Sequence, residues 1–309
     1  MQHKTKEDNM LKLFSKEKPS KTAYNAAWFR ACSHKDFQDQ IWGPDFIAEG
    51  FLSFPIKLLN KSKKFREKVK AKTNESTPGV YEYIIARTLF FDEVFTQALK
   101  ESIPQIVFLG AGYDSRGIRF KHLNNSTQMI ELDMAATQNR KIKCLKKNKI
   151  KIPEYLTFTT IDFNNQSLES ALTSAGYQKG KRTLFIWEGV CMYLEAQSVR
   201  DTLTFIQQSS TSDSLLAFDC VVSFSDKDGH KYHGAKEMLQ FMKDKHKNEP
   251  FTFSIDGKNI ADFLGECGHK IVRHLNQDQI ETTYLKKADG SSIGKPNGLF
   301  NMIITSPEV

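Results

Sequence analysis

Two glycines and an acid follow a short apolar run near the middle of the chain. Residues 105–109 include an unbroken apolar, β-branched block, which is typical of a strand covered on both faces in a parallel sheet. Gly110, Ala111 and Gly112 come next, and the two glycines lack the Cβ atoms that would keep a ligand away from the backbone. This turn is consistent with a nucleotide site and equally with an ordinary glycine turn, because the complete Gly-x-Gly-x-x-Gly pattern is missing.

Acids stand at the ends of the next three apolar runs. Asp133 follows Gly112 by 21 positions, where a nucleoside site places the carboxylate that binds ribose hydroxyls. Asp162 precedes Phe163, a pair able to accept from an adenine amine and to cover its ring, and Glu188 ends the following run. Each acid alone is consistent with a helix cap or a solvated loop. Their joint position predicts an adenosine site.

The residues after the glycine turn discriminate between adenosine ligands. A dinucleotide would usually place its pyrophosphate against glycine amides and a helix N-terminus. Here the acid Asp114 stands two residues after Gly112, which suits a cationic ammonium or sulfonium better than a diphosphate. The sequence therefore favours S-adenosyl-L-methionine over a nicotinamide dinucleotide as the cofactor.

The elements that position these residues divide the chain near residue 100. The first part has helical patterns, broken by Gly43-Pro44, by Pro55 and by the turn-rich residues 73–79; the expected helices span residues 23–33, 45–52, 57–70 and 80–100. After residue 100, apolar runs alternate with helical patterns at 135–147, 166–175 and 196–209. The seven expected strands span residues 105–109, 128–132, 156–161, 183–187, 215–219, 270–274 and 301–305. This alternation predicts an α/β fold with a doubly wound, mostly parallel sheet.

Composition and charge narrow the setting of the protein. The five cysteines are scattered without a Cys-x-x-Cys pair, so we expect reduced thiols and no metal site. Residues 1–16 lack an apolar core of signal-peptide length, and no apolar stretch is long enough to span a membrane, so we expect a cytoplasmic protein.

The net charge is +8, and six lysines cluster at Lys141, Lys143, Lys146, Lys147, Lys149 and Lys151. Their spacing predicts the solvated face of a helix, and without interleaved aromatic residues a nucleic acid partner is not expected.

The same motifs resemble the leucine carboxyl methyltransferase family, and in particular its bacterial branch of S-adenosylmethionine-dependent O-methyltransferases. The resemblance extends over nearly the whole chain and is carried by residues 86–92, 109–116, 131–133, 162–163 and 188–194, with weaker likeness at 22–27 and 43–49. It implies a class I methyltransferase fold, with residues 1–100 as a helical N-terminal cap and 101–309 as the cofactor-binding core. The cap is expected to cover the methyl acceptor.

The resemblance also implies a role for each site residue. Arg87 would pair with the methionyl carboxylate, for which a guanidinium fork is suited. Glu188 would line the methionyl end, and Tyr193 could face either cofactor or acceptor. The remaining cofactor contacts would come from Gly110, Ala111, Gly112, Asp114, Asp133, Asp162 and Phe163.

Methyl transfer from a sulfonium depends mainly on alignment, and a carboxylate acceptor is ionised without a base. A phenol or enol acceptor would need a general base, and His230 and His233 are candidates for that role. The sequence does not identify the acceptor, which is a small molecule or a carboxyl group. A non-catalytic sensor of adenosine ligands and a nicotinamide-dependent oxidoreductase remain alternatives.

Overall fold

The computed structural model describes residues 18–38, 45–163, 165–225, 227–245 and 249–308, and its centre is one β-sheet. The sheet order is β3-β2-β1-β4-β5-β8-β7, with the two-residue strand β6 paired to β5. Strands β1 to β5 are parallel, and β8 runs antiparallel to both of its neighbours. The strands are β1 (Gln105–Leu109), β2 (Gln128–Asp133), β3 (Leu156–Thr160), β4 (Thr183–Trp187), β5 (Leu215–Ser223), β6 (Ile255–Asp256), β7 (His269–Leu275) and β8 (Phe300–Pro307). All seven expected strands are confirmed, and β6 is an eighth that the sequence analysis missed.

Two apolar clusters cover the two faces of this sheet. Along β1, Ile106 and Phe108 belong to one cluster, and Val107 and Leu109 to the other, as the period of two in a strand requires. The second cluster contains the helices α8 (Leu168–Ser174), α9 (Ala196–Ser209) and α11 (Ile260–Glu266). The first contains α5 (Val80–Lys100), α10 (Ala235–Lys245) and α12 (Gln277–Tyr284). Because both faces are covered by helices, the sheet is doubly wound, as expected.

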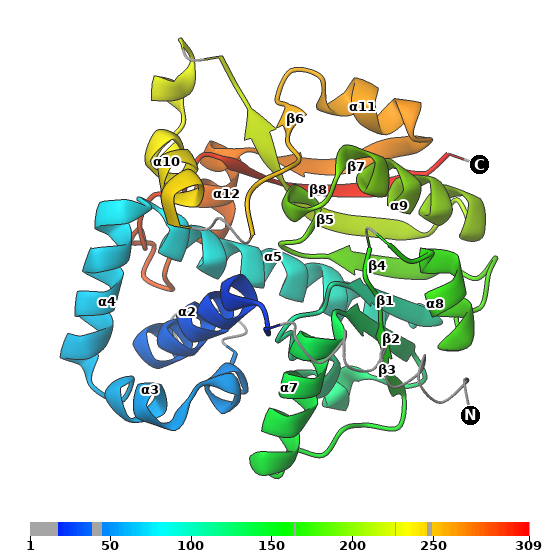
Figure 1. The fold of residues 1–309 in the computed structure, drawn as a ribbon, viewed down its shortest axis with the longest axis horizontal. Coiled ribbons are helices and arrows are strands. Elements are labelled where there is room, and N and C mark those ends of the chain that lie inside the picture. Colours follow the sequence, from blue (N-terminus) through cyan, green and yellow to red (C-terminus); the bar gives the residue numbers. More distant parts are fainter. Residues whose placement is uncertain (1–17, 39–44, 164, 226, 246–248, 309) are drawn as a thin grey trace, which may run out of the picture.

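The N-terminal helices lie together beside the sheet. Figure 1 shows α2 (Lys21–Phe37), α3 (Phe54–Leu59) and α4 (Lys63–Ser76) at the left of the view, with α8, α9 and α11 at the right. The single helix expected at 57–70 is wrong, because Pro55 stands in the first turn of α3, and the chain breaks again before α4. The turn expected at 73–79 is also shorter, since α4 continues to Ser76. The expected break at Gly43-Pro44 lies outside the described residues.

The lysine cluster lies on α7 (Ala135–Lys147) and just beyond its end. Five of its lysines are exposed, as the helical spacing predicted. Lys141 is the exception, because it is buried and bonded to the Glu131 carboxylate. A lysine is seldom buried unless it is paired with an acid, so Lys141 belongs to the core rather than to a basic surface.

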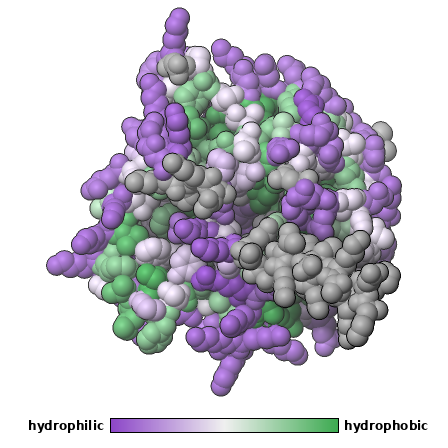
Figure 2. Space-filling view, in the orientation of Figure 1, coloured by the Kyte–Doolittle hydropathy of each residue, from purple (hydrophilic) through white to green (hydrophobic). Residues whose placement is uncertain are grey.

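Apolar side chains also reach the surface near α3. Among the large apolar residues of the described chain, Phe54 is 75% exposed and Leu58 is 56% exposed. Figure 2 shows hydrophobic side chains gathered at the lower left, over the N-terminal helices, on a face that is otherwise largely hydrophilic.

In the described part of the chain, no helix is both long and apolar enough to cross a membrane. Short elements complete the fold at α6 (Arg116–Arg119), η1 (Ala48–Phe51), η2 (Lys121–Leu123), η3 (Cys191–Tyr193) and η4 (Gly229–Lys231).

Candidate active site

A cavity of about 710 Å³ lies where the carboxyl ends of β1, β2 and β4 face the helices α2, α4, α5 and α10. This is the edge at which ligands bind in doubly wound sheets. All nine residues that the sequence analysis nominated for cofactor binding line it: Arg87, Gly110, Ala111, Gly112, Asp114, Asp133, Asp162, Phe163 and Glu188. Residues separated by up to about 100 positions in the sequence are therefore brought to one space.

The glycine turn forms the floor of the cavity at the end of β1. Gly110 has φ +71° and Gly112 has φ +52°, a backbone region that favours glycine. A Cβ atom on Gly110 would lie 2.5 Å from a methyl carbon of Val190, so the turn also requires the absence of a side chain there. The Gly112 N–H donates to the Asp133 carboxylate, which fixes the acid at the end of β2 against the turn. Burial raises the pKa of Asp133 to about 6.

Asp162 and Phe163 follow β3 and are both half-buried. The Asp162 backbone N–H donates to the Gln166 side chain at 2.9 Å, and Asn165 donates to the Asp162 carboxylate at 2.7 Å. These bonds turn the chain back after β3 and hold both residues at the cavity. Asn165 also lines the cavity, although the sequence analysis did not nominate it.

A buried network centred on Arg116 holds the acids nearest the glycine turn. The Arg116 guanidinium contacts Asp114 at 2.5 Å, Glu188 at 2.6 Å and Asp92 at 2.8 Å. The Arg116 backbone N–H also donates to Asp114. Burial would raise the pKa of Asp114, but Arg116, Lys141, Arg30 and the hydrogen bond from the Arg116 backbone together lower it, so this carboxylate stays ionised. Arg116 is a positioning residue that sequence reasoning missed, although it stands within the quoted motif at 109–116.

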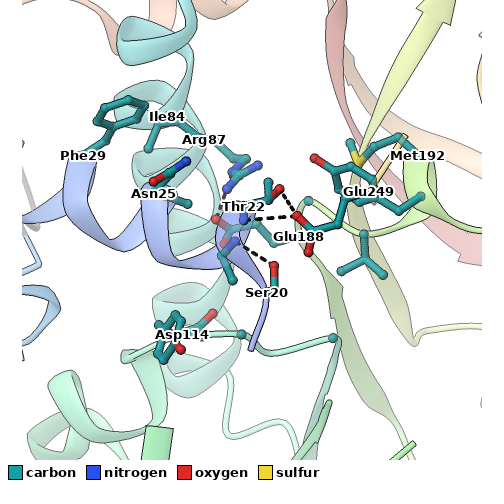
Figure 3. A pocket seen from close by; sticks show the side chains of 18 of the residues that line it. Ser20, Thr22, Asn25, Phe29, Ile84, Arg87, Asp114, Glu188, Met192 and Glu249 are labelled. Carbon is teal, nitrogen blue, oxygen red and sulfur yellow. Dashed lines mark hydrogen bonds and ion pairs between the residues drawn. The ribbon is translucent and has the colours of Figure 1, made fainter. Parts of the chain in front are cut away.

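Arg87 projects from α5 into the same region, as Figure 3 shows. Its Nε lies 3.0 Å from Glu188 and its Nη1 lies 3.4 Å from Asp219, whereas Nη2 takes part in neither ion pair. Tyr83 and the Gly189 backbone N–H also donate to Asp219. Burial raises the pKa of Asp219, with Arg87 opposing that rise. Asp219 ended the expected strand at 215–219, so the rule that found the other acids could have found this one.

The far side of the cavity is built differently. Its lining there is mainly apolar and comes from α2, α4, α5, α10 and β8: Phe29, Val69, Val80, Ile84, Met238, Phe241, Met242 and Phe300. Thr22 and Glu249 stand among these residues, and neither was nominated from the sequence. The two candidate bases, His230 and His233, do not line the cavity. His230 is exposed, with its Nδ1 2.7 Å from the Lys227 carbonyl oxygen, so the structure does not bring either histidine to the site.

The charges of the lining describe the kind of ligand that fits. Among the described lining residues there are five acids, namely Asp114, Asp133, Asp162, Glu188 and Glu249, and two arginines, namely Arg30 and Arg87. Arg30 is already paired with Asp45 at 3.0 Å. A negative wall beside the glycine turn suits a nucleoside that carries a positive charge, and it disfavours a pyrophosphate.

The chain has an α/β fold like that of the class I methyltransferases. A Thermobifida fusca protein described as a "putative methyltransferase" superposes with a TM-score of 0.55 over 96% of this chain and 97% of that one, at 13% identity. A DUF574 family protein from Streptomyces avermitilis has a TM-score of 0.56 at 11% identity, over 79% of this chain and 90% of that one. At these low identities, the two superpositions show a shared fold and nothing beyond it.

The sequence comparisons supply the family. Residues 22–207 match the family described as leucine carboxyl methyltransferase, and the chain belongs to this family. The Bacillus subtilis protein named "Putative S-adenosyl-L-methionine-dependent methyltransferase YktD" is 23% identical over 286 residues, which cover 87% of this chain and 92% of that protein. A Mycolicibacterium paratuberculosis protein with the same description is 28% identical over 183 residues, covering 59% of this chain and 56% of its own length.

These matches decide between the alternatives that the sequence left open. The protein is an S-adenosylmethionine-dependent methyltransferase, as the resemblance implied. A nicotinamide-dependent oxidoreductase and a non-catalytic sensor are not supported by any of these relatives. The acidic lining beside the glycine turn fits the cationic nucleoside that this class of enzyme uses.

Proposed function

We propose that this enzyme transfers the methyl group to an oxygen atom of a small molecule or of a carboxyl group. The family description names a carboxyl acceptor, which supports oxygen rather than nitrogen or carbon. We further propose that residues 1–100 act as the cap over the acceptor and that 101–309 act as the core that binds the cofactor.

We assign the cofactor contacts as follows. Asp133 accepts from the ribose hydroxyls, Asp162 accepts from the adenine amine, and Phe163 covers the adenine. Gly110, Ala111 and Gly112 let the nucleoside approach the backbone, while Asp114 and Glu188 face the methionyl end. Arg87 binds the methionyl carboxylate through Nη2, the nitrogen that is outside its two ion pairs.

One observation carries this assignment: the nine residues line a single cavity at the carboxyl edge of the sheet. The cofactor supplies an electrophilic methyl group on a sulfonium. The protein supplies alignment, since the glycine turn and the acids fix the nucleoside while the cap holds the acceptor in line. Because positive charge disappears from the sulfonium as the methyl leaves, strong stabilisation of that charge is not what accelerates the step.

Calorimetry with S-adenosyl-L-homocysteine tests the assignment. We expect Asp133→Ala and Arg87→Ala each to weaken binding by about tenfold or more, because each removes a charged hydrogen-bonding partner of the ligand. Asp213→Ala is the matched control, since Asp213 is exposed and distant from the cavity lining. Circular dichroism of each variant establishes that it is folded. Unchanged affinity in both folded variants would contradict the assignment.

A metabolite screen tests the reaction itself. Incubation with a small-molecule extract and isotopically labelled S-adenosyl-L-methionine should give a labelled product in which tandem mass spectrometry locates the methyl group on oxygen. A product labelled on nitrogen or carbon would contradict the proposed reaction.

A further inference from the structure

The apolar half of the cavity contains one acid. Glu249 is half-buried, lies in the sequence between α10 and β6, and lines the cavity beside the beginning of α2. Apolar side chains on α5 and α10, among them Ile84 and Met242, line the same cavity. No cofactor contact was assigned to any of these residues. A carboxylate in such surroundings needs an anchor, namely hydrogen-bond donors that replace the water it has lost.

Thr22 is that anchor. Its backbone N–H donates to Glu249 Oε2 at 3.2 Å, and its hydroxyl donates to the same oxygen. Figure 3 shows Glu249 reaching Thr22 at the beginning of α2. Thr22 lies in the first turn of this 17-residue helix, where the helix dipole favours a negative charge. Within the described residues, Oε1 makes no hydrogen bond, so Thr22 holds one oxygen of this cavity-lining carboxylate and leaves the other available to a ligand.

Tyr193 connects Glu249 with the methionyl end of the site. Burial raises the pKa of the Tyr193 hydroxyl, the positive charge of Arg87 lowers it, and the negative charge of Glu249 raises it. Tyr193 therefore lies within electrostatic reach of both charged groups, and it lines the same cavity. Arg87, Tyr193 and Glu249 thus line one cavity, so a ligand bound there can contact Glu249 as well as the methionyl end of the site.

This arrangement discriminates between acceptors of different charge. A carboxylate acceptor would be placed beside the Glu249 carboxylate, and like charges at close range repel. An amine would be held in its protonated form by the acidic lining, and a protonated amine has no lone pair for attack. A neutral hydroxyl on an apolar body avoids both penalties, and it can donate its proton to Glu249 Oε1.

We propose that the acceptor is an apolar molecule carrying a neutral phenolic or enolic hydroxyl, and that Glu249 is the base that receives its proton. This inference rests on the proposed function. The acceptor oxygen uses a lone pair to form the new bond to the methyl carbon, while the electron pair of the breaking S–C bond stays on sulfur. The O–H proton passes to Glu249. The sulfonium and the carboxylate are both neutralised, so charge balances and separated charge disappears from an apolar space.

The first experiment uses three naphthalene probes substituted at the same ring position: naphthol, naphthoic acid and naphthylmethylamine. Calorimetry measures the binding of each probe to enzyme saturated with S-adenosyl-L-homocysteine. We expect naphthol to bind at least about tenfold more tightly than the other two, which corresponds to about 1.4 kcal/mol. Preference for the acid or the amine, or no binding of any probe, would overturn the inference. Failure of S-adenosyl-L-homocysteine itself to bind would instead contradict the proposed function.

The second experiment tests the role of Glu249 through the pH profile of naphthol methylation. We expect Glu249→Gln to retain its affinity for S-adenosyl-L-homocysteine and to lose about 10²-fold or more in kcat near neutral pH. That loss should shrink as the pH rises toward about 10, where the phenol ionises unaided. Glu237→Gln is the matched control, because Glu237 is exposed on α10 and does not line the cavity. An equal loss at every pH would overturn the assignment of Glu249 as the base.

Discussion

The cavity has two walls that hold their side chains by different means. We call the side at the ends of β1, β2, β3 and β4 the strand-end wall, and the mainly apolar side, which includes Thr22 and Glu249, the cap wall. On the strand-end wall, Asp114 and Glu188 are fixed by Arg116, and Asp133 is fixed by a backbone N–H of the glycine turn. On the cap wall, most of the lining is apolar, and the polar contact that stands out is Thr22 with Glu249. Charged groups in fixed positions select one ligand closely, because a misplaced partner leaves a buried charge unpaired. An apolar wall selects by shape and size, and it discriminates less steeply.

This difference explains how one fold can combine a constant methyl donor with a variable acceptor. The strand-end wall is built from backbone turns and ion pairs that few substitutions would leave intact. The cap wall is built from side chains such as Val69 and Met242, whose exchange for other apolar residues changes the shape of the cavity without leaving a charge unpaired. Substitutions on the two walls should therefore have different consequences, in the order that follows.

The largest effect is expected for Arg116→Ala, which tests whether the strand-end wall depends on one cation. The substitution leaves three buried or nearly buried acids, Asp92, Asp114 and Glu188, without their shared partner. Breaking a buried ion pair on one side costs about 3–5 kcal/mol in the free energy of unfolding. Urea denaturation of the variant and the wild-type protein measures this change in the free energy of unfolding. The control is Lys63→Ala, which removes an exposed pair with Glu67 and should cost less than about 0.5 kcal/mol. Similar urea midpoints for both variants would show that Arg116 does not organise this wall.

Much of the fold could be predicted from the sequence because its signals are local. Strands such as β1 and β4 are short, fully buried runs, and α7 and α9 begin and end at the residues expected from their amphipathic spacing. The errors also have local causes. Pro55 was interpreted as a break, although proline is well tolerated in a first helical turn, and α10, α11 and α12 lie in a part of the chain where no helical pattern was identified.

Some residues of the site could likewise be predicted from the sequence, and others could not. The acids of the strand-end wall could be found because the carboxyl ends of parallel strands meet at one edge, so position along the chain predicts position in space. The pairing of Arg116 with Asp92 could not be found, since the two residues lie on different elements and meet only through packing. Glu249 was missed because it stands in no regular element and carries no motif.

An intermediate effect is expected at Asp133, and it depends on pH. Burial raises the pKa of this carboxyl to about 6, above its ordinary value of 3.8, so the ionised form that accepts from ribose hydroxyls is lost as the pH falls through about 6. Affinity for S-adenosyl-L-homocysteine should therefore be level above pH 7 and fall by about tenfold between pH 7 and pH 5. Calorimetry across this range measures it.

Asp133→Asn supplies the comparison for this pH dependence. The amide cannot ionise, so the variant should bind about 10- to 100-fold more weakly at pH 7.5 and show no slope arising from this position. A slope that persists in the Asn variant would assign the titration to another group, of which Glu131 is the nearest candidate, because burial raises its pKa to about 7. The ionised Asp133 also costs stability in the free protein, so the unfolding free energy should decline as the pH rises from about 4 to 6.

The smallest effect on the protein itself is expected on the cap wall, at Val69→Ala. Val69 is half-buried on α4 and lines the cavity without a polar contact, so its truncation should change the unfolding free energy by only about 0.5 kcal/mol. Affinity for S-adenosyl-L-homocysteine should stay the same, since α4 contributes none of the nine cofactor residues. The added space should instead improve the binding of naphthols that carry an extra alkyl group relative to naphthol itself, which calorimetry on the S-adenosyl-L-homocysteine-loaded enzyme would detect. A change in cofactor affinity with no change in acceptor preference would mean that the two walls are not the separate functional surfaces inferred here.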